Sequence, residues 1–129
     1  MSKGLILFAH GARDPRWALP FEALAARIAQ GRPGLALRLA YLEFIAPTLP
    51  AAIDDLVAAG CQRVDVLPLF LGVGGHVRRD LPQLLDDARR RHLGLVLGLR
   101  RAIGEEPSVQ AAMAAVALAD DAFADTGAA

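Results

Sequence analysis

The first apolar stretch of the chain, Gly4–Ala9, is uninterrupted by any polar residue and is followed at once by His10 and Gly11. A short continuous apolar run bounded by turn residues predicts a strand that is buried on both faces. Asp14 and Pro15 then predict the start of a helix, because Asp caps helix N-termini and Pro is favoured in the first turn. A polar group at the carboxyl end of such a strand lies where open α/β sheets bind ligands, so His10 is the first candidate site residue.

Strand and helix signals alternate four times along the chain. Strands are predicted over 4–9, 35–42, 64–71 and 95–99, and helices over 15–30, 48–60, 80–92 and 107–123. Pro68 predicts a bulge or an early end in the third strand, because proline cannot donate a ladder hydrogen bond. The alternation indicates one parallel sheet with helices on both faces. We expect a flavodoxin-like α/β fold with four parallel strands in the order 2-1-3-4.

Composition limits the class of protein. The chain has 129 residues, enough for one domain with a core, and 54% of them are hydrophobic. Fourteen basic and fourteen acidic residues cancel, so net charge indicates no nucleic-acid or membrane partner. No apolar run approaches the roughly 20 residues that cross a bilayer, and no secretory signal is predicted. The lone Cys61 cannot form an internal disulfide, so we expect a soluble, cytoplasmic protein.

Three residues occupy the same place in successive strand–helix units: His10, Glu43 and His76. They are 33 residues apart in each case, which is about the length of one unit. The carboxyl ends of parallel strands lie at one edge of a sheet, so these side chains can converge there. Two imidazoles and a carboxylate suit a divalent cation such as Co(II), Fe(II), Ni(II) or Zn(II). Three ligands would leave a coordination position open for a substrate.

Structural roles are the alternative for each of these residues. A single histidine at a strand end is often only hydrogen-bonded, Glu43 could be a solvated carboxylate, and equal spacing could reflect regular units. The third histidine, His92, ends a predicted helix after three arginines, where a solvated face that complements the helix dipole explains it. Neither Ser2 nor Ser108 lies in a Gly-x-Ser-x-Gly elbow, and the glycine-rich loop before His76 matches no nucleotide-binding motif.

Three longer motifs resemble those of a known family. They are His-Gly-x-Arg-x-Pro from His10 to Pro15, Tyr-Leu-Glu-Phe from Tyr41 to Phe44, and Pro-Leu-Phe-Leu…Gly-x-His-x-x-x-Asp-Leu-Pro from Pro68 to Pro82. Together they resemble the short sirohydrochlorin chelatases, which are class II chelatases of cobalamin and sirohaem biosynthesis. The resemblance covers residues 1–125 and implies a single chelatase half-domain. Residues 126–129, at the end of the chain, are expected to fray.

The resemblance implies a lyase that inserts a divalent metal into sirohydrochlorin, an anionic tetrapyrrole, and that works as a homodimer. The metal is then a substrate, with Co²⁺ expected first and Fe²⁺ or Ni²⁺ as alternatives, and no tightly bound cofactor is implied. The family's metal-binding histidines correspond to His10 and His76, and their acidic partner corresponds to Glu43. Each histidine could bind the metal or accept a pyrrole proton, since histidine titrates near neutrality, and the division of roles stays open.

Residues close in sequence to the two histidines complete the expected site. Four arginines are candidates for holding substrate carboxylates through charge-assisted hydrogen bonds: Arg13, Arg16, Arg78 and Arg79. Each could equally be a solvated arginine at a helix start. Gly74 and Gly75 are expected to let the backbone approach the flat macrocycle. The alternative function is a non-catalytic metal or tetrapyrrole carrier with the same His/Glu/His set, and a third is an interaction domain whose histidines are structural.

Overall fold

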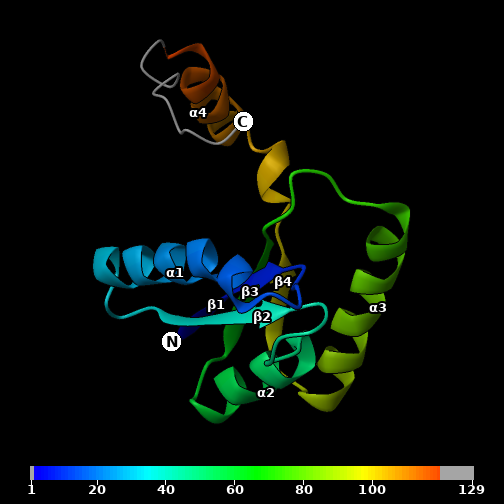
Figure 1. Cartoon of the computed structure of the whole chain (residues 1–129). Helices are drawn as coiled ribbons and strands as arrows, with labels where there is room; N and C mark the ends of the chain where they lie inside the picture. The colour runs from blue at the N-terminus through cyan, green and yellow to red at the C-terminus, as the bar shows by residue number, and fades with distance from the viewer. Residues whose placement is uncertain (1, 120–129) are drawn as a thin grey trace.

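The structure, a computed structural model, describes residues 2–119 of the chain. Four strands form one parallel sheet in the order β2-β1-β3-β4, which confirms the predicted topology (Figure 1). The strands are β1 (Lys3–Ala9), β2 (Ala36–Tyr41), β3 (Arg63–Pro68) and β4 (Val96–Leu99). The helices are α1 (Leu19–Gly31), α2 (Leu49–Ala58), α3 (Gly75–Arg91) and α4 (Pro107–Leu118), with 3-10 turns η1 (Pro15–Ala18) and η2 (Ile103–Glu105).

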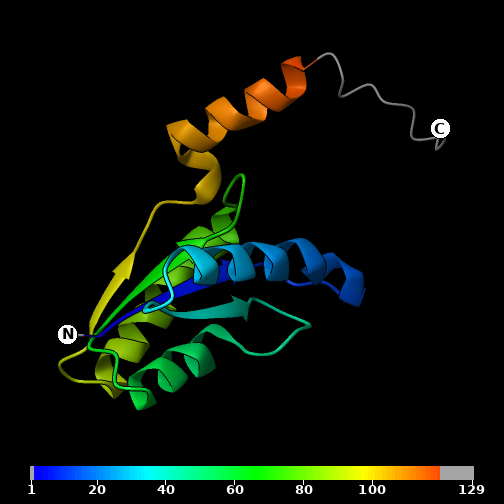
Figure 2. The same ribbon diagram turned by 90° about the vertical axis from the view of Figure 1, so that its left-hand side faces the viewer.

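Helices cover both faces of the sheet, as predicted. Helix α1 lies on one face, and α2 and α3 lie on the other (Figure 2). The central strand β1 is buried at every position from Gly4 to Ala9, as its apolar sequence predicts. The main core forms between the sheet and the pair α2 and α3, and its largest buried members are Ile6, Phe8, Leu49, Ile53, Leu56, Val64, Val66 and Leu85. No helix among residues 2–119 is long and apolar enough to cross a membrane.

The predicted helix caps are present. The Thr48 hydroxyl accepts a hydrogen bond from the Ala51 N–H at 3.3 Å, which satisfies a free donor at the start of α2. Gly60 follows α2 with a φ of +98°, the left-handed conformation that ends many helices. The Asp14 carboxylate accepts from the Arg16 N–H at 2.9 Å, but the helix predicted from residue 15 begins as the separate turn η1 before α1.

Apart from α1, the largest differences from the predicted ranges are in β3, α3 and α4. Strand β3 ends at Pro68, three residues before the predicted end, which is the early end that proline favours. Helix α3 begins at Gly75 and not at Asp80, with Gly74 as an extended N-cap residue, and it tolerates Pro82 in its interior. Helix α4 ends at Leu118. Ala119 is already extended, so the predicted continuation of this helix to 123 is wrong from residue 119 on. Residues 120–123 of that prediction and the predicted fraying of 126–129 lie outside the described residues.

The sequence predicts that His92 is solvated, but in the structure its side chain links the end of α3 to α2. Its Nε2 contacts the Asp54 carboxylate of α2 at 2.6 Å, and the Arg91 guanidinium donates to the same oxygen at 3.0 Å. The hydrogen bond from His92, with a further contribution from Arg91, holds the pKa of Asp54 below its usual value although burial acts in the other direction. His92 therefore has a structural role at the end of the sheet away from His10.

Candidate functional site

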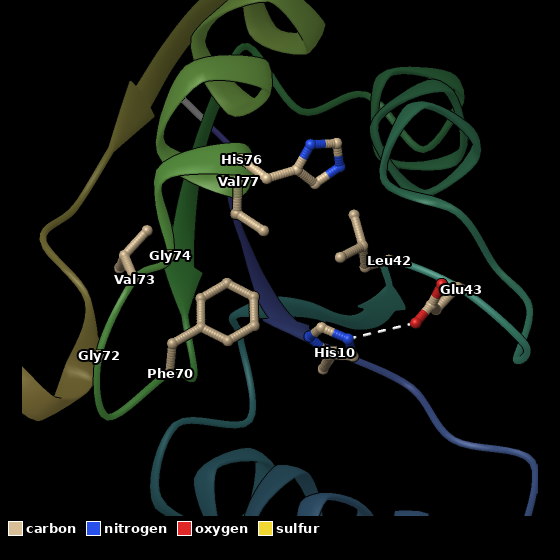
Figure 3. Close-up of a pocket in the computed structure, with 9 residues that line it drawn as sticks. All are labelled: His10, Leu42, Glu43, Phe70, Gly72, Val73, Gly74, His76 and Val77. Atoms are coloured by element: carbon tan, nitrogen blue, oxygen red, sulfur yellow. Dashed lines mark ion pairs between the residues drawn. The ribbon is translucent and has the colours of Figure 1, made fainter.

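A pocket of about 610 Å³ opens at the carboxyl edge of the sheet, where the ends of β1, β2 and β3 meet the start of α3 (Figure 3). This is the position at which open α/β sheets bind ligands. The three candidate ligands all contribute to its wall, together with apolar side chains and the glycine-rich loop. The lining residues are His10, Leu42, Glu43, Phe70, Gly72, Val73, Gly74, His76 and Val77.

The backbone holds His10 and Glu43 side by side. The Glu43 N–H donates to the His10 carbonyl at 3.1 Å, which extends the pairing of β1 with β2 beyond the strands. Gly11 makes this approach feasible, because its φ is +93° and a Cβ at this residue would collide with the Glu43 carbonyl oxygen. As a result His10 Nε2 lies 3.2 Å from Glu43 Oε1, with both side chains about half exposed.

His76 projects from the first turn of α3, on the other side of the pocket from His10 (Figure 3). Its Nε2 lies 3.3 Å from Asp80 Oδ2, one helical turn further along α3. Asp80 is a site residue that the sequence reasoning missed. The i,i+4 spacing from His76 is the signal that could have identified it, but that spacing has meaning only within a helix, and the predicted helix begins at Asp80 itself.

The three candidate ligands share one pocket but do not form a closed cluster. Among residues 2–119, no group of three or more His, Cys, Asp and Glu side chains is arranged to hold a metal ion. The His10–Glu43 pair and the His76–Asp80 pair stand on facing sides. Phe70 lies beside His10, and its ring meets the His10 ring edge-on at a centroid distance of 6.3 Å. The pocket thus has His10 and Glu43 on one side and His76 on the other, while Asp80, the partner of His76, is not among the residues that line it.

None of the four candidate arginines lines this pocket. Arg16 is bound to Asp14, with Nη2 and Oδ2 2.8 Å apart, and this hydrogen bond lowers the pKa of Asp14 and raises that of Arg16. The Arg13 guanidinium lies over the Phe44 ring, 4.8 Å from its centroid. Arg78 lines a neighbouring pocket between α3 and the end of β4, and Arg79 is exposed on α3. Of the two candidate glycines, Gly74 lines the pocket and Gly75 does not.

Comparison with known proteins shows the family of the chain. The family model of CbiX matches residues 4–118, nearly all of the described chain. The chain belongs to the CbiX family. The sirohydrochlorin cobaltochelatase of Saccharolobus solfataricus is 32% identical over 97 residues, which are 70% of this chain and 73% of that protein. The sirohydrochlorin cobaltochelatase of Methanococcus aeolicus is 31% identical over 83 residues, which are 64% of this chain but only 58% of the relative. The resemblance seen in the motifs is therefore confirmed.

Solved structures of CbiX and SirB proteins share the fold. A CbiX protein from Marinobacter aquaeolei, named for cobalamin (vitamin B12) biosynthesis, superimposes with a TM-score of 0.78 at 31% identity and covers 89% of this chain and 93% of its own. The sirohydrochlorin chelatase SirB from Bacillus subtilis subspecies spizizenii, solved in complex with cobalt, gives a TM-score of 0.73 at 21% identity. The match covers 82% of this CbiX chain but only 45% of SirB, so SirB is about twice as long.

Proposed function

We propose that this CbiX-family chain is a sirohydrochlorin chelatase that inserts a divalent metal ion into the macrocycle, with Co²⁺ as its preferred metal. The observation that carries the proposal is a pocket with His10 and Glu43 on one side and, on the facing side, His76, which is paired with Asp80. The names of the archaeal relatives support the substrate and the metal. A cytoplasmic location and a role in cobalamin or sirohaem biosynthesis are parts of the same proposal.

The His10–Glu43 pair is the proposed entry point for the metal. Two ligands bound to one metal at about 2.1 Å are separated by about 3.0 Å at right angles and about 3.4 Å at a tetrahedral angle. The separation of 3.2 Å between His10 Nε2 and Glu43 Oε1 lies between these values, so both atoms could bind one cation after little movement. An imidazole and a carboxylate suit borderline divalent cations such as Co²⁺.

His76 is the proposed base. Metal insertion replaces two pyrrole N–H protons by one M²⁺ ion, so the site must accept protons beside the macrocycle. Asp80 faces Nε2 of His76, which leaves Nδ1 as the nitrogen that can take a pyrrole proton. A carboxylate behind a histidine orients its ring and stabilises its charged form. Glu43 is then the second proton acceptor once the metal has left it.

The macrocycle is proposed to lie against the glycine-rich loop. At Gly72, Gly74 and Gly75, a Cβ would meet no described atom within 4 Å, so packing inside the chain does not require glycine at these positions. A flat ligand close to the backbone would require it. For the substrate carboxylates we assign Arg13, Arg78 and Arg79 before Arg16, because Asp14 already neutralises Arg16.

We further infer that two copies of the chain act together as a homodimer. The pocket is open at the sheet edge, with both of its histidine–carboxylate pairs partly exposed. The matched part of the chain corresponds to less than half of each Bacillus subtilis SirB chain. A second copy facing the pocket would enclose the macrocycle from the other side.

The alternative carrier function is less well supported by the donor arrangement. A protein that stores a metal tightly needs a closed set of ligands, as structural metal sites have. Among residues 2–119 the donors come as two pairs and no cluster of three is present. Two adjacent donors suit a metal that is bound weakly and passed on.

An anaerobic absorbance assay tests the proposal. Purified protein is mixed with sirohydrochlorin and Co²⁺, Fe²⁺ or Ni²⁺, and the loss of the free-macrocycle spectrum is compared with a control lacking protein. We expect His10→Ala and His76→Ala each to lower the rate about 100-fold or more, while His92→Gln, a histidine outside the pocket, retains the wild-type rate. Binding without acceleration would establish a carrier, and wild-type rates in either alanine variant would refute the site.

A further inference from the structure

Helix α4 is an apolar helix whose main contact in the described chain is with the adjacent turn η2. Every residue from Gln110 to Leu118 is exposed, and all but the first of them are Ala, Val, Met or Leu. Val116 is 67% and Leu118 is 81% exposed. A helix that is apolar on all sides is normally buried, and one of 12 residues is only marginally stable alone in water. Another surface must therefore cover α4.

The base of α4 is fixed to the carboxyl edge of the sheet. In η2, the Gly104 N–H donates to the Phe70 carbonyl at 2.9 Å, and a Cβ on Gly104 would collide with the Leu71 backbone. The Gln110 side chain then donates to the Gly104 carbonyl at 2.9 Å and joins α4 to this turn. These contacts direct α4 away from its own sheet (Figure 2), so the helix does not return to cover it.

The same chain has a sheet face without a helix. Leu97 of β4 and Val64 and Val66 of β3 pack into the core with α2 and α3, so their neighbours in sequence point to the opposite face. On that face α1 packs against β2, and no helix of residues 2–119 covers β3 and β4 (Figure 1). Val96, the register partner of Arg63, is 52% exposed there.

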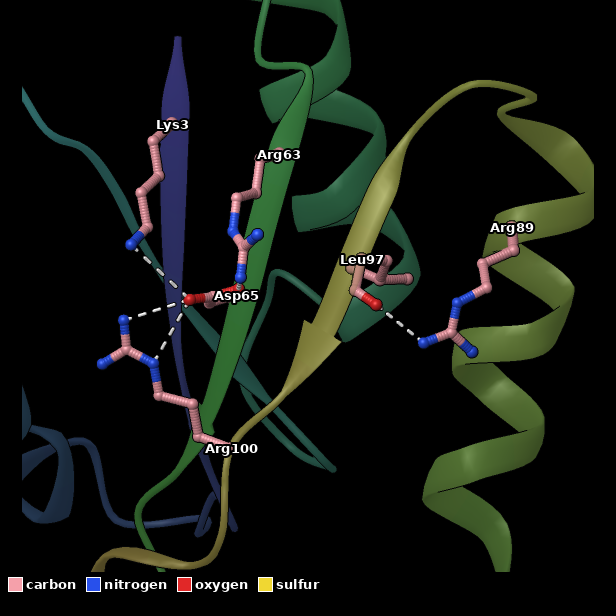
Figure 4. A network of polar contacts seen from close by, with 6 residues as sticks. All are labelled: Lys3, Arg63, Asp65, Arg89, Leu97 and Arg100. Carbon is pink, nitrogen blue, oxygen red and sulfur yellow. Dashed lines mark hydrogen bonds and ion pairs between the residues drawn. The ribbon is translucent and has the colours of Figure 1, made fainter. Parts of the chain in front are cut away.

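A group of charged side chains marks this uncovered face (Figure 4). The buried Asp65 carboxylate contacts Arg100 at 3.1 Å, Arg63 at 3.5 Å and Lys3 at 3.7 Å. The three cations are 40 to 48% exposed, whereas Asp65 is 8% exposed. Three positive charges around one carboxylate leave the face with an excess of two positive charges. It can therefore accept an apolar segment that ends in negative charge.

We propose that α4 of one copy packs on the β3–β4 face of a second copy, and that the α4 of the second copy packs reciprocally on the first. This inference rests on the homodimer proposed above but not on the proposed metal-insertion activity. Each copy carries both an uncovered apolar helix and an uncovered sheet face, so two copies related by a two-fold axis satisfy both at once. No third partner is needed.

Size and charge of the two surfaces match. A helix of 12 residues is about 18 Å long, and the six residues of β3 span about 20 Å. Helix α4 contains no charged residue, and its carboxyl end carries the negative end of the helix dipole. The excess positive charge of Lys3, Arg63 and Arg100 is complementary to this end.

The test measures the dimer of the full chain by analytical ultracentrifugation, without metal or macrocycle, so its outcome is independent of chelatase activity. The helix variant Val116→Glu/Leu118→Glu and the face variant Val96→Glu are each expected to weaken dimerisation about 100-fold. Leu93→Glu is the matched control, because Leu93 is 92% exposed but lies before β4 at the other edge of the sheet. It should dimerise like the wild type. Circular dichroism verifies that each variant is folded.

A mixing experiment distinguishes a dimer in which α4 of each copy packs on the other copy from a dimer with a different interface. The helix variant keeps an intact face and the face variant keeps an intact helix, so a 1:1 mixture restores one of the two contacts. We expect the mixture to form heterodimers that are weaker than the wild-type dimer but tighter than either variant alone. A monomeric wild type at about 50 µM, a dimer that persists in the helix variant, or a mixture that associates no better than its components would overturn the proposal.

Discussion

Replacing Gly11 with alanine should damage both the fold and the pocket, because this position has two constraints that only glycine meets. Its φ of +93° is rarely adopted by residues with a side chain, and an added Cβ would collide with the Glu43 carbonyl oxygen. The conformational strain alone costs about 1–2 kcal/mol. Relieving the collision separates Glu43 from His10 and breaks a backbone hydrogen bond worth about 1 kcal/mol. We expect the free energy of unfolding to fall by about 2–3 kcal/mol, or Tm by about 10 °C.

Urea unfolding followed by circular dichroism measures this loss, and Gly34→Ala is the matched control. Gly34 has no positive φ, and a Cβ added there would meet no described atom within 4 Å, so its substitution should change stability by no more than about 0.5 kcal/mol. At a temperature where Gly11→Ala is still folded, its metal-insertion rate should also fall, because His10 and Glu43 no longer converge. A Gly11→Ala protein as stable as the Gly34→Ala control would refute the assigned role of this glycine.

Three further predictions concern single side chains. Asp80→Asn should lower kcat about tenfold, because the amide no longer stabilises a protonated His76, with an unchanged urea midpoint showing that the fold is intact. Gly74→Ala should leave stability nearly unchanged but raise KM for sirohydrochlorin, because a methyl group then lies between backbone and macrocycle; an unchanged KM would place the macrocycle elsewhere. Burial raises the pKa of Asp65, but Arg100, Arg63 and Lys3 outweigh it and hold that pKa below its usual value. The carboxylate therefore stabilises the fold above about pH 4 and loses this effect as the pH falls through its folded pKa, so Asp65→Asn should cost about 1–2 kcal/mol at pH 7 and less at pH 3 in urea unfolding.

The order of elements could be predicted from the sequence because each signal is local. The apolar run of β1, the Thr48 cap and the end of β3 at Pro68 each depend on a few adjacent residues. The start of α3 could not be predicted in the same way. Gly74 and Gly75 are typical of a loop, yet Gly74 is an N-cap residue and Gly75 is already helical. Because the predicted start of α3 is five residues too late, His76 lies outside the predicted helix and its i,i+4 pairing with Asp80 is not recognised.

For the arginines, closeness in sequence to a candidate histidine did not predict whether the side chain points toward the pocket. Arg78 is two residues from His76 on a helix, and two residues correspond to about 200° around the helix axis. The two side chains therefore point to opposite sides, and Arg78 lines the neighbouring pocket. Asp80, four residues from His76, returns to the same side. Arg16 was recognisable as a cation, but its pairing with Asp14 depends on how η1 turns, which the sequence does not specify.

The division of the donors into two pairs helps to explain how a protein could transfer a metal ion instead of retaining it. The backbone bond between His10 and Glu43 holds two possible ligands together, and a cation bound by two groups keeps open positions that pyrrole nitrogens can occupy in turn. A third protein ligand beside them would slow this exchange by holding the metal more tightly. The second histidine, His76, lies across the pocket, where we propose that it accepts the released proton, and Asp80 lies beside it. The proposed division of the equally spaced residues His10, Glu43 and His76 into a metal-binding pair and a facing base therefore favours insertion into a macrocycle over storage.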